Sequence, residues 1–309
     1  MPSRKIFTSR LLAGAALIAA GAAAPAAAQV VVTVDDDPGN DAAYVDGTGG
    51  NFTGADALQL AVSAINNDAT PDITTWEIQI VDTDGAADTY LSDLQLAKAG
   101  LSIVQVPNGN GDDVGVTLES ENVALDQNGT ILFNQPNQLL QGLSEDKPIT
   151  LVVPASGDPA WGTQGAPNAD GMTIRNVVYT GGGAGRFNHN GNAPTATWEN
   201  VSFNALGQGP QITAGVVNYN NVTFNASGFP FILVGSTSEA NFTGCTINGS
   251  NQMHLGASGC VTTLTNCEIN FPSTPIVNSN PLGAGHDITF DSCTFSPGTG
   301  VVFSNADVD

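Results

Sequence analysis

A six-residue phrase recurs six times in the second half of the chain. It reads apolar, any residue, small polar, apolar, any residue, apolar, and its copies are Ile174 to Tyr179, Trp198 to Phe203, Tyr219 to Phe224, Phe242 to Ile247, Leu264 to Ile269 and Phe290 to Phe295. The copies follow one another every 21 to 26 residues. A unit of that length cannot bury its apolar face alone and must stack on its neighbours. The repeat therefore predicts a solenoid.

The third position of the phrase predicts a sharp corner in each coil. It is held by Asn176, Asn200, Asn221, Gly244, Asn266 and Ser292. Asn, Gly and Ser tolerate the left-handed backbone that such a corner needs. Apolar residues then alternate at period two, as in Val201 and Phe203, which is typical of short strands with one buried face. An antiparallel sandwich would instead show two-residue glycine turns and no constant phase, so we expect a parallel β-helix.

Before the repeats, one segment has the pattern of an amphipathic helix. Leu58, Ala61, Val62 and Ile65 share one face of a helix expected over residues 56 to 66. Thr53 and the acidic residue three positions later form a variant of the capping box. A helix here would cover the open edge of the first coil, where unpaired strand backbone would recruit other chains.

The N-terminus predicts export. Arg4, Lys5 and Arg10 precede an apolar run that is short for a membrane span, and Ala26-Ala27-Ala28 ends in small residues suited to signal peptidase. We expect a signal peptide at residues 1–28, an acidic segment at 29–52 and a β-helix domain at 53–309. The expected location is extracellular or on the surface of a bacterium, without a transmembrane segment in the mature chain.

Charge narrows the range of partners. The chain carries 29 acidic and seven basic residues, for a net charge of −22, and removal of the leader would leave four basic residues, Lys98, Lys147, Arg175 and Arg186. Such a surface repels nucleic acid and anionic lipid. Uronate polymers would also be repelled unless divalent cations bridged them. We expect a polysaccharide or cell-surface component as the partner, with self-association through the C-terminal edge as a further hypothesis.

The four cysteines leave two interpretations open. Cys245, Cys267 and Cys293 occupy the repeat position where earlier copies carry valine, which favours an inward stack of thiols acting as small hydrophobes. One disulfide, involving Cys260, is the alternative, because stacked coils bring such positions about 4.8 Å apart. A metal site at these cysteines is not indicated, since the sequence contains no C-x-x-C pair.

Three acidic clusters suit a hard cation. Asp82, Asp84 and Asp88 surround a glycine turn, and carboxylate oxygens of this kind are what calcium prefers. A second cluster contains Asp35-Asp36-Asp37, and a third extends from Asn108 to Asp113. None completes an EF-hand loop, which also needs a bidentate Glu. Calcium at Asp82, Asp84 and Asp88 is therefore one hypothesis, and an acidic turn without a metal, which is common, is the alternative.

The helix at 56–66, the asparagine corners and phrases such as Asn221-Val222-Thr223-Phe224-Asn225 resemble the pectate-lyase-like superfamily of right-handed parallel β-helices. The resemblance covers about residues 50 to 309. It implies the all-β, right-handed parallel β-helix fold with an N-terminal capping helix, whereas function varies widely across the superfamily. Its lyases combine calcium-binding carboxylates with an arginine or lysine base, and its hydrolases place several aspartates in a groove. No clustered aspartate motif is present in the repeats of this chain.

Candidate catalytic residues are Arg175, Arg186 and His189, which surround a glycine-rich connection between two repeats. An arginine near calcium could act as a base on a carbohydrate, and a histidine could transfer protons near neutral pH. The non-catalytic interpretation is that Arg175 points outward from a strand and pairs with an acidic residue. We therefore favour a glycan- or surface-binding, adhesin-like protein. The alternatives are a calcium-dependent polysaccharide lyase or glycoside hydrolase, and a structural sheath or coat subunit.

Overall fold

The computed structural model describes a large part of the chain, and its described residues are 28–37, 42–70, 73–91, 94–109, 111, 113–119, 131–152, 161–162, 170–181, 187–189, 195–204, 209–212, 214–226, 232–233, 238–249, 253–255, 259–271, 277–279, 287–296 and 303–304. Residues 1–27, almost all of the expected signal peptide, lie outside these ranges. Arg186 also lies outside them.

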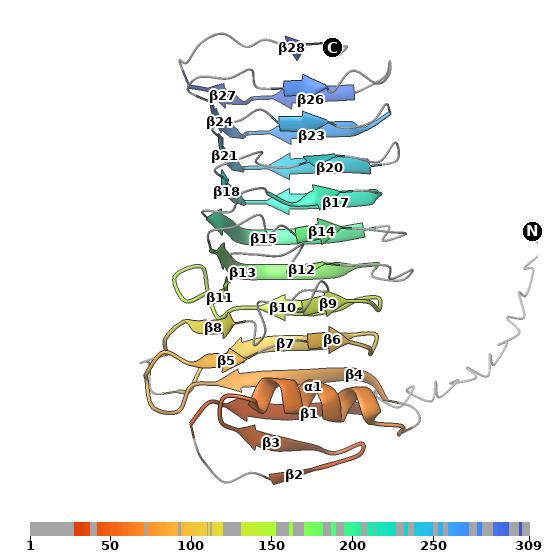
Figure 1. The fold of residues 1–309 in the computed structure, drawn as a ribbon, viewed down its shortest axis with the longest axis vertical. Coiled ribbons are helices and arrows are strands. Elements are labelled where there is room, and N and C mark those ends of the chain that lie inside the picture. Colours follow the sequence, from red (N-terminus) through yellow and green to blue (C-terminus); the bar gives the residue numbers. More distant parts are fainter. Residues whose placement is uncertain are drawn as a thin grey trace, which may run out of the picture.

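The described residues form a parallel β-solenoid whose coils stack along one long axis, from the N-terminal strands at one end to the C-terminal strands at the other (Figure 1). One column of parallel strands runs its whole length and consists of β1 (Ala28–Asp35), β4 (Ile73–Val81), β7 (Leu101–Val106), β10 (Leu139–Gln141), β13 (Met172–Thr180), β15 (Thr195–Asn204), β17 (Gly215–Asn220), β20 (Ser238–Thr243), β23 (Val261–Thr265) and β26 (Asp287–Asp291). The parallel stacking of coils that the repeat phrase predicted is confirmed.

A second column follows the first around a corner. It contains β5 (Thr89–Leu91), β8 (Val116–Glu119), β11 (Ile149–Val152), the second halves of β13 and β15, β18 (Thr223–Ala226), β21 (Thr246–Gly249), β24 (Glu268–Asn270) and β27 (Thr294–Phe295). A separate parallel sheet closes the coils and contains β6 (Leu94–Leu96), β9 (Ile131–Phe133), β12 (Trp161–Gly162), β14 (Phe187–His189), β16 (Gln211–Ile212), β19 (Ile232–Leu233), β22 (Met253–Leu255), β25 (Val277–Ser279) and β28 (Phe303–Ser304).

The corner between the two columns has the backbone that the sequence predicted. All six residues at the third position of the phrase have positive φ, namely Asn176 (52°), Asn200 (53°), Asn221 (58°), Gly244 (64°), Asn266 (54°) and Ser292 (57°). The asparagine side chains also link successive coils. The Nδ2 of Asn200 donates to Oδ1 of Asn176 at 3.1 Å, and the Nδ2 of Asn221 donates to Oδ1 of Asn200 at 3.3 Å.

The interior of the repeats is filled by stacked aromatic side chains. The rings of Phe203 and Phe224 stack with centroids 5.3 Å apart, and those of Tyr219 and Phe242 stack at 4.9 Å. Trp198 is fully buried and lies 5.3 Å from Phe203. Offset stacking of this kind adds to the free energy that burial of the rings already provides.

The cysteines fill core positions as thiols. Cys245 and Cys267 are buried, and their thiols donate to the carbonyls of Tyr219 at 3.3 Å and of Thr265 at 3.4 Å. Cys293 continues the column with partial exposure, and Cys260 is buried elsewhere in the core. All four are free. The structure therefore agrees with the inward thiol stack and contains no disulfide among these four residues. The neighbouring thiol of Cys267, together with burial, raises the pKa of Cys245.

The strands that precede the helix join the same sheet. β1 pairs in parallel with β4 and also with β3 (Gly49–Thr53), which in turn pairs antiparallel with β2 (Ala42–Val45). Val30, Val32 and Val34 of β1 are fully buried. Residues 29–52, expected as a separate acidic segment, thus contribute strands to the same sheet, because their alternating valines need the same core.

The helix α1 (Ala57–Asn67) forms one residue later than predicted and buries Leu58, Ala61, Val62 and Ile65. It contacts β1, β3, β4, β5 and β6. The predicted capping box is wrong: Asp56 is the N-cap residue and its side chain makes no capping hydrogen bond. The β2–β3 hairpin extends the sheet beyond β1. The described residues contain no helix with the length and apolarity needed to cross a membrane.

Candidate functional site

Arg175 points outward from β13 and is paired with neighbouring coils. Its Nε lies 2.8 Å from Oε2 of Glu199 on β15, and its Nη1 donates to Oε1 of Gln141 on β10 at 3.1 Å. Because the register aligns these three residues on successive coils, the contacts form a short polar ladder along the outer face. The prediction that Arg175 is an outward strand residue paired with an acid is confirmed.

The other catalytic candidates are not assembled around Arg175 in the described residues. His189 is the last residue of β14, which belongs to the separate closing sheet, whereas Arg175 lies in the long column of the first sheet. Arg186 falls outside the described residues. β13 and β14, the strands on either side of the glycine-rich connection, therefore belong to two different sheets.

The aspartates predicted to bind calcium do come together. Asp82, Asp84 and Asp88 lie in the turn between β4 and β5, and each offers a carboxylate oxygen within 4.8 Å of the others. The turn is shaped by its own side chains, since Gly85 N donates to Oδ1 of Asp82 at 2.7 Å and Ala86 N donates to Oδ1 of Asp84 at 2.6 Å. Asp82 and Asp88 are almost completely buried, whereas Asp84 is exposed.

The structure adds a second acidic cluster that sequence analysis kept separate. β1 and β4 pair in register with Val34 opposite Ile80, so the turns that follow them leave neighbouring strands at the same end. Thr83 donates its hydroxyl to Oδ2 of Asp35 at 2.7 Å, and Thr89 N donates to Oδ2 of Asp36 at 3.0 Å. We call the six residues Asp35, Asp36, Asp37, Asp82, Asp84 and Asp88 the aspartate corner.

The charges of the aspartate corner are not balanced by basic residues. None of its six members contacts a lysine or arginine among the described residues, whereas Asp113 of the third acidic cluster lies 3.9 Å from the Nζ of Lys147. Burial and the neighbouring carboxylate of Asp36 raise the pKa of Asp88 well above its usual range. A buried carboxylate without a cation is costly, so the aspartate corner concentrates unbalanced negative charge in the described residues.

A column of amides marks the outer face of the second strand column. Successive coils place four asparagines in register, and each donates from Nδ2 to Oδ1 of the preceding one: Asn225 to Asn204 at 2.8 Å, Asn248 to Asn225 at 2.6 Å and Asn270 to Asn248 at 2.9 Å. Ser296 continues the series by donating to Asn270. We call Asn204, Asn225, Asn248 and Asn270 the amide column. Sequence analysis missed it, although an asparagine follows the repeat phrase in four copies.

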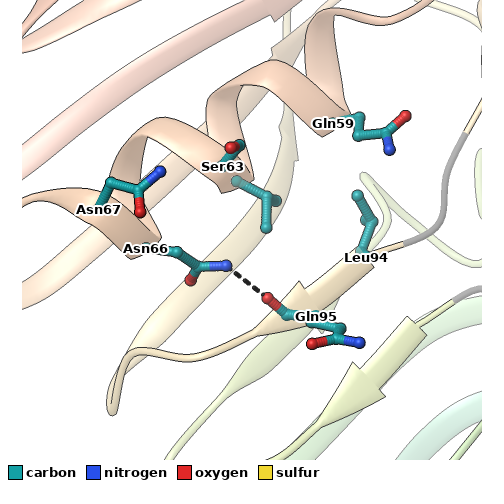
Figure 2. A pocket seen from close by; sticks show the side chains of 7 residues that line it. Gln59, Ser63, Asn66, Asn67, Leu94 and Gln95 are labelled. Atoms are coloured by element: carbon teal, nitrogen blue, oxygen red, sulfur yellow. Dashed lines mark hydrogen bonds between the residues drawn. The ribbon is translucent and has the colours of Figure 1, made fainter.

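A shallow pocket of about 320 Å³ lies between α1 and β6 (Figure 2). Its lining is mostly neutral and polar and comprises Gln59, Val62, Ser63, Asn66, Asn67, Leu94 and Gln95. Asn66 is already used to fasten the helix, because its Nδ2 donates to the carbonyl of Gln95 at 2.6 Å and its Oδ1 accepts from Ala97 N at 3.0 Å. The pocket is thus held by the contacts that dock α1.

Comparison with family models, with curated proteins and with solved structures found no match for this chain. The aspartate corner, the amide column and the pocket beside α1 are therefore the features from which its function has to be inferred.

Proposed function

We propose that the protein is an exported bacterial surface protein that binds an extended, neutral glycan along the amide column. Each inner amide uses one of its two N–H donors and one of its two oxygen lone pairs within the column. Asn225 and Asn248 each retain one donor and one acceptor, repeated at the strand spacing of about 4.8 Å. This repetition is the observation that carries the proposal, because a polymer of hydroxyl-bearing units presents matching groups at regular intervals.

Charge supports a neutral ligand. The chain has a net charge of −22, so a polyanionic polysaccharide would meet long-range repulsion. The amide column itself contains no ionised side chain, and the nearest acid in hydrogen-bond contact, Glu268, accepts from Asn270 at 3.1 Å. The resemblance to pectate-lyase-like right-handed β-helices belongs to the same proposal and is supported by the capping helix followed by asparagine corners.

No contact of the described residues favours the polysaccharide lyase or hydrolase alternative. The guanidinium of Arg175 already donates hydrogen bonds to Glu199 and Gln141, and His189 lies on β14 of the closing sheet. The digestion assay for this alternative measures new reducing ends and unsaturated products from neutral and acidic polysaccharides, with calcium and with chelator. Calcium-dependent cleavage that Arg175→Ala abolishes would replace glycan binding by an enzymatic function.

The binding proposal is tested with two matched double variants. Asn225→Ala combined with Asn248→Ala removes two inner members of the amide column, and Asn218→Ala combined with Asn241→Ala removes an equivalent amide pair on the same two coils, bonded at 3.2 Å. Affinity electrophoresis in neutral and acidic polysaccharides should show neutral-glycan binding that the first variant weakens about tenfold, as two lost hydrogen bonds would do. The second variant should bind like the parent. Equal effects of both variants, or binding to no glycan, would contradict the proposal.

A further inference from the structure

The carboxylate of Asp88 is an unsatisfied group inside the aspartate corner. The residue is 2 % exposed, and its Oδ2 is buried without a hydrogen-bond partner. The other deeply buried member, Asp82, accepts backbone N–H bonds at both oxygens, from Gly85 at 2.7 Å and from Val114 at 3.1 Å. Because a buried carboxylate oxygen without a partner loses its hydration and gains nothing in return, a ligand or a proton has to compensate it.

The group that compensates Asp88 must be positive and small. Asp88 presents an oxygen within 4.8 Å of oxygens from Asp82 and Asp84. Asp36, from the turn after β1, is held at the same place because its Oδ2 accepts from the N–H of Thr89, the residue after Asp88, at 3.0 Å. All these neighbours are acceptors, and no lysine or arginine among the described residues contacts them. The exposed side chain of Asp84 gives the corner an opening to solvent.

We propose that a divalent cation with the ligand preference of calcium binds in the aspartate corner, held by Asp36, Asp82, Asp84 and Asp88. Oxygen donors from flexible turns suit calcium, which accepts six to eight oxygens in variable geometry. Asp82 can accept its backbone bonds and still coordinate, because an ionised carboxylate has about four lone-pair sites. The sequence predicted three of these residues; Asp36 is added by the pairing of β1 with β4.

Such an ion would stabilise the contact between the first two coils. Its ligands come from the turn after β1 and from the turn after β4, which the structure otherwise joins through Thr83 and Thr89. A cation that binds only the folded chain stabilises it in proportion to the logarithm of its concentration. The site is independent of the amide column, so its presence or absence does not decide the glycan proposal.

The first experiment compares thermal unfolding in calcium and in chelator. At a calcium concentration one hundred times the Kd, we expect the Tm of the parent protein to rise by about 5 °C. Asp88→Asn should abolish this rise, because the amide removes a charged ligand without changing the size of the side chain. Asp287→Asn, an exposed acid on β26 at the other end of the solenoid, is the matched control and should keep the full rise.

One result would overturn the proposal. If the Tm of the parent is the same in calcium and in chelator, while Asp88→Asn raises the Tm equally in both, then Asp88 shares a proton with Asp36 and no cation is bound. Should Asp88→Asn fail to fold, Asp36→Asn and calorimetric titration of the parent with calcium decide the question, with one tightly bound ion per chain expected and no binding heat contradicting the site.

A spectroscopic measurement locates the ion. The phenol of Tyr90, two residues after Asp88, is fully buried beside the aspartate corner. Burial and the nearby charges of Asp88, Asp36 and Asp35 raise its pKa. Terbium, which replaces calcium at oxygen sites, should therefore show luminescence excited through Tyr90 and displaced by calcium. Tyr90→Phe should remove most of that signal while the calcium-induced rise in Tm remains. Unchanged luminescence in Tyr90→Phe would place the ion elsewhere.

Discussion

The first coils and the later repeats of this solenoid achieve stability in different ways. From β13 to β26, every corner has the same left-handed backbone, and asparagines or stacked rings connect each coil to the next. From β1 to β8, the interior is largely aliphatic but includes the buried rings of Trp76 and Tyr90. Here individual hydrogen bonds of aspartates hold the turns and the hairpin, and those of Asn66 hold the helix. Stability is therefore spread over many equivalent contacts in the repeats and concentrated in a few polar groups at the N-terminal end.

The greatest loss of stability is expected from a change in the aromatic interior of the repeats. Trp198→Ala should lower the free energy of unfolding by about 3–5 kcal/mol, because Trp198 is fully buried and packs against Tyr179, Phe203 and Tyr219. Denaturant unfolding followed by circular dichroism measures the loss. Thr197→Ala, the outward neighbour on β15, is the control and should change stability by less than about 0.5 kcal/mol. A similar loss in both variants would contradict the stacked core.

The next effect tests the polar fastening of the N-terminal end. Asp68 is 2 % exposed and accepts hydrogen bonds from the Tyr44 hydroxyl at 2.6 Å, Gly47 N at 2.9 Å and Thr70 N at 2.8 Å. Asp68→Asn should cost about 1–3 kcal/mol, because an amide can accept at only one of the two oxygen positions. Asp56→Asn is the control, since the side chain of Asp56 makes no capping bond.

The same residue predicts a pH dependence. Burial would raise the pKa of Asp68, but the bonds from Tyr44, Gly47 and Thr70 outweigh it and hold the pKa well below its usual range. The unfolded pKa is about 3.9, so the contribution of Asp68 to stability is fully present above that pH and is lost as the pH falls towards the folded value. Unfolding measured from pH 6 to pH 2 should show this loss in the parent and not in Asp68→Asn. Equal pH profiles would contradict it.

The smallest effect tests the repeated corner. Asn200→Ala should cost about 1–2 kcal/mol, because a β-carbon side chain without a local hydrogen bond is strained at φ 53°. Asn200→Gly should cost less, because glycine accepts this backbone and Gly244 occupies the equivalent corner. Chemical denaturation of both variants gives the comparison. If glycine and alanine were equally destabilising, the hydrogen bonds of Asn200, and not its backbone, would dominate.

Features set within one coil or one turn could be predicted from the sequence, whereas features set by packing between distant segments could not. Asn176, Asn200 and Asn221 predicted their left-handed corners because sterics select the same few residues at each one. The capping box at Asp56 was wrong because hairpin and helix packing, absent from the sequence pattern, set the backbone there. The catalytic candidates Arg175 and His189, close in sequence, belong to different sheets.

The stacked parallel coils, their corner residues and the turn that joins Asp82, Asp84 and Asp88 could be predicted from the amino-acid sequence, because local sterics and period-two burial act within one coil or one turn. The folded structure was needed to show that Asp36 lies beside the turn of Asp88, that β1 belongs to the solenoid sheet, that all four cysteines are free and that four asparagines align in a column. These contacts depend on the register between strands far apart in sequence, and hydrogen bonding across the whole sheet sets that register.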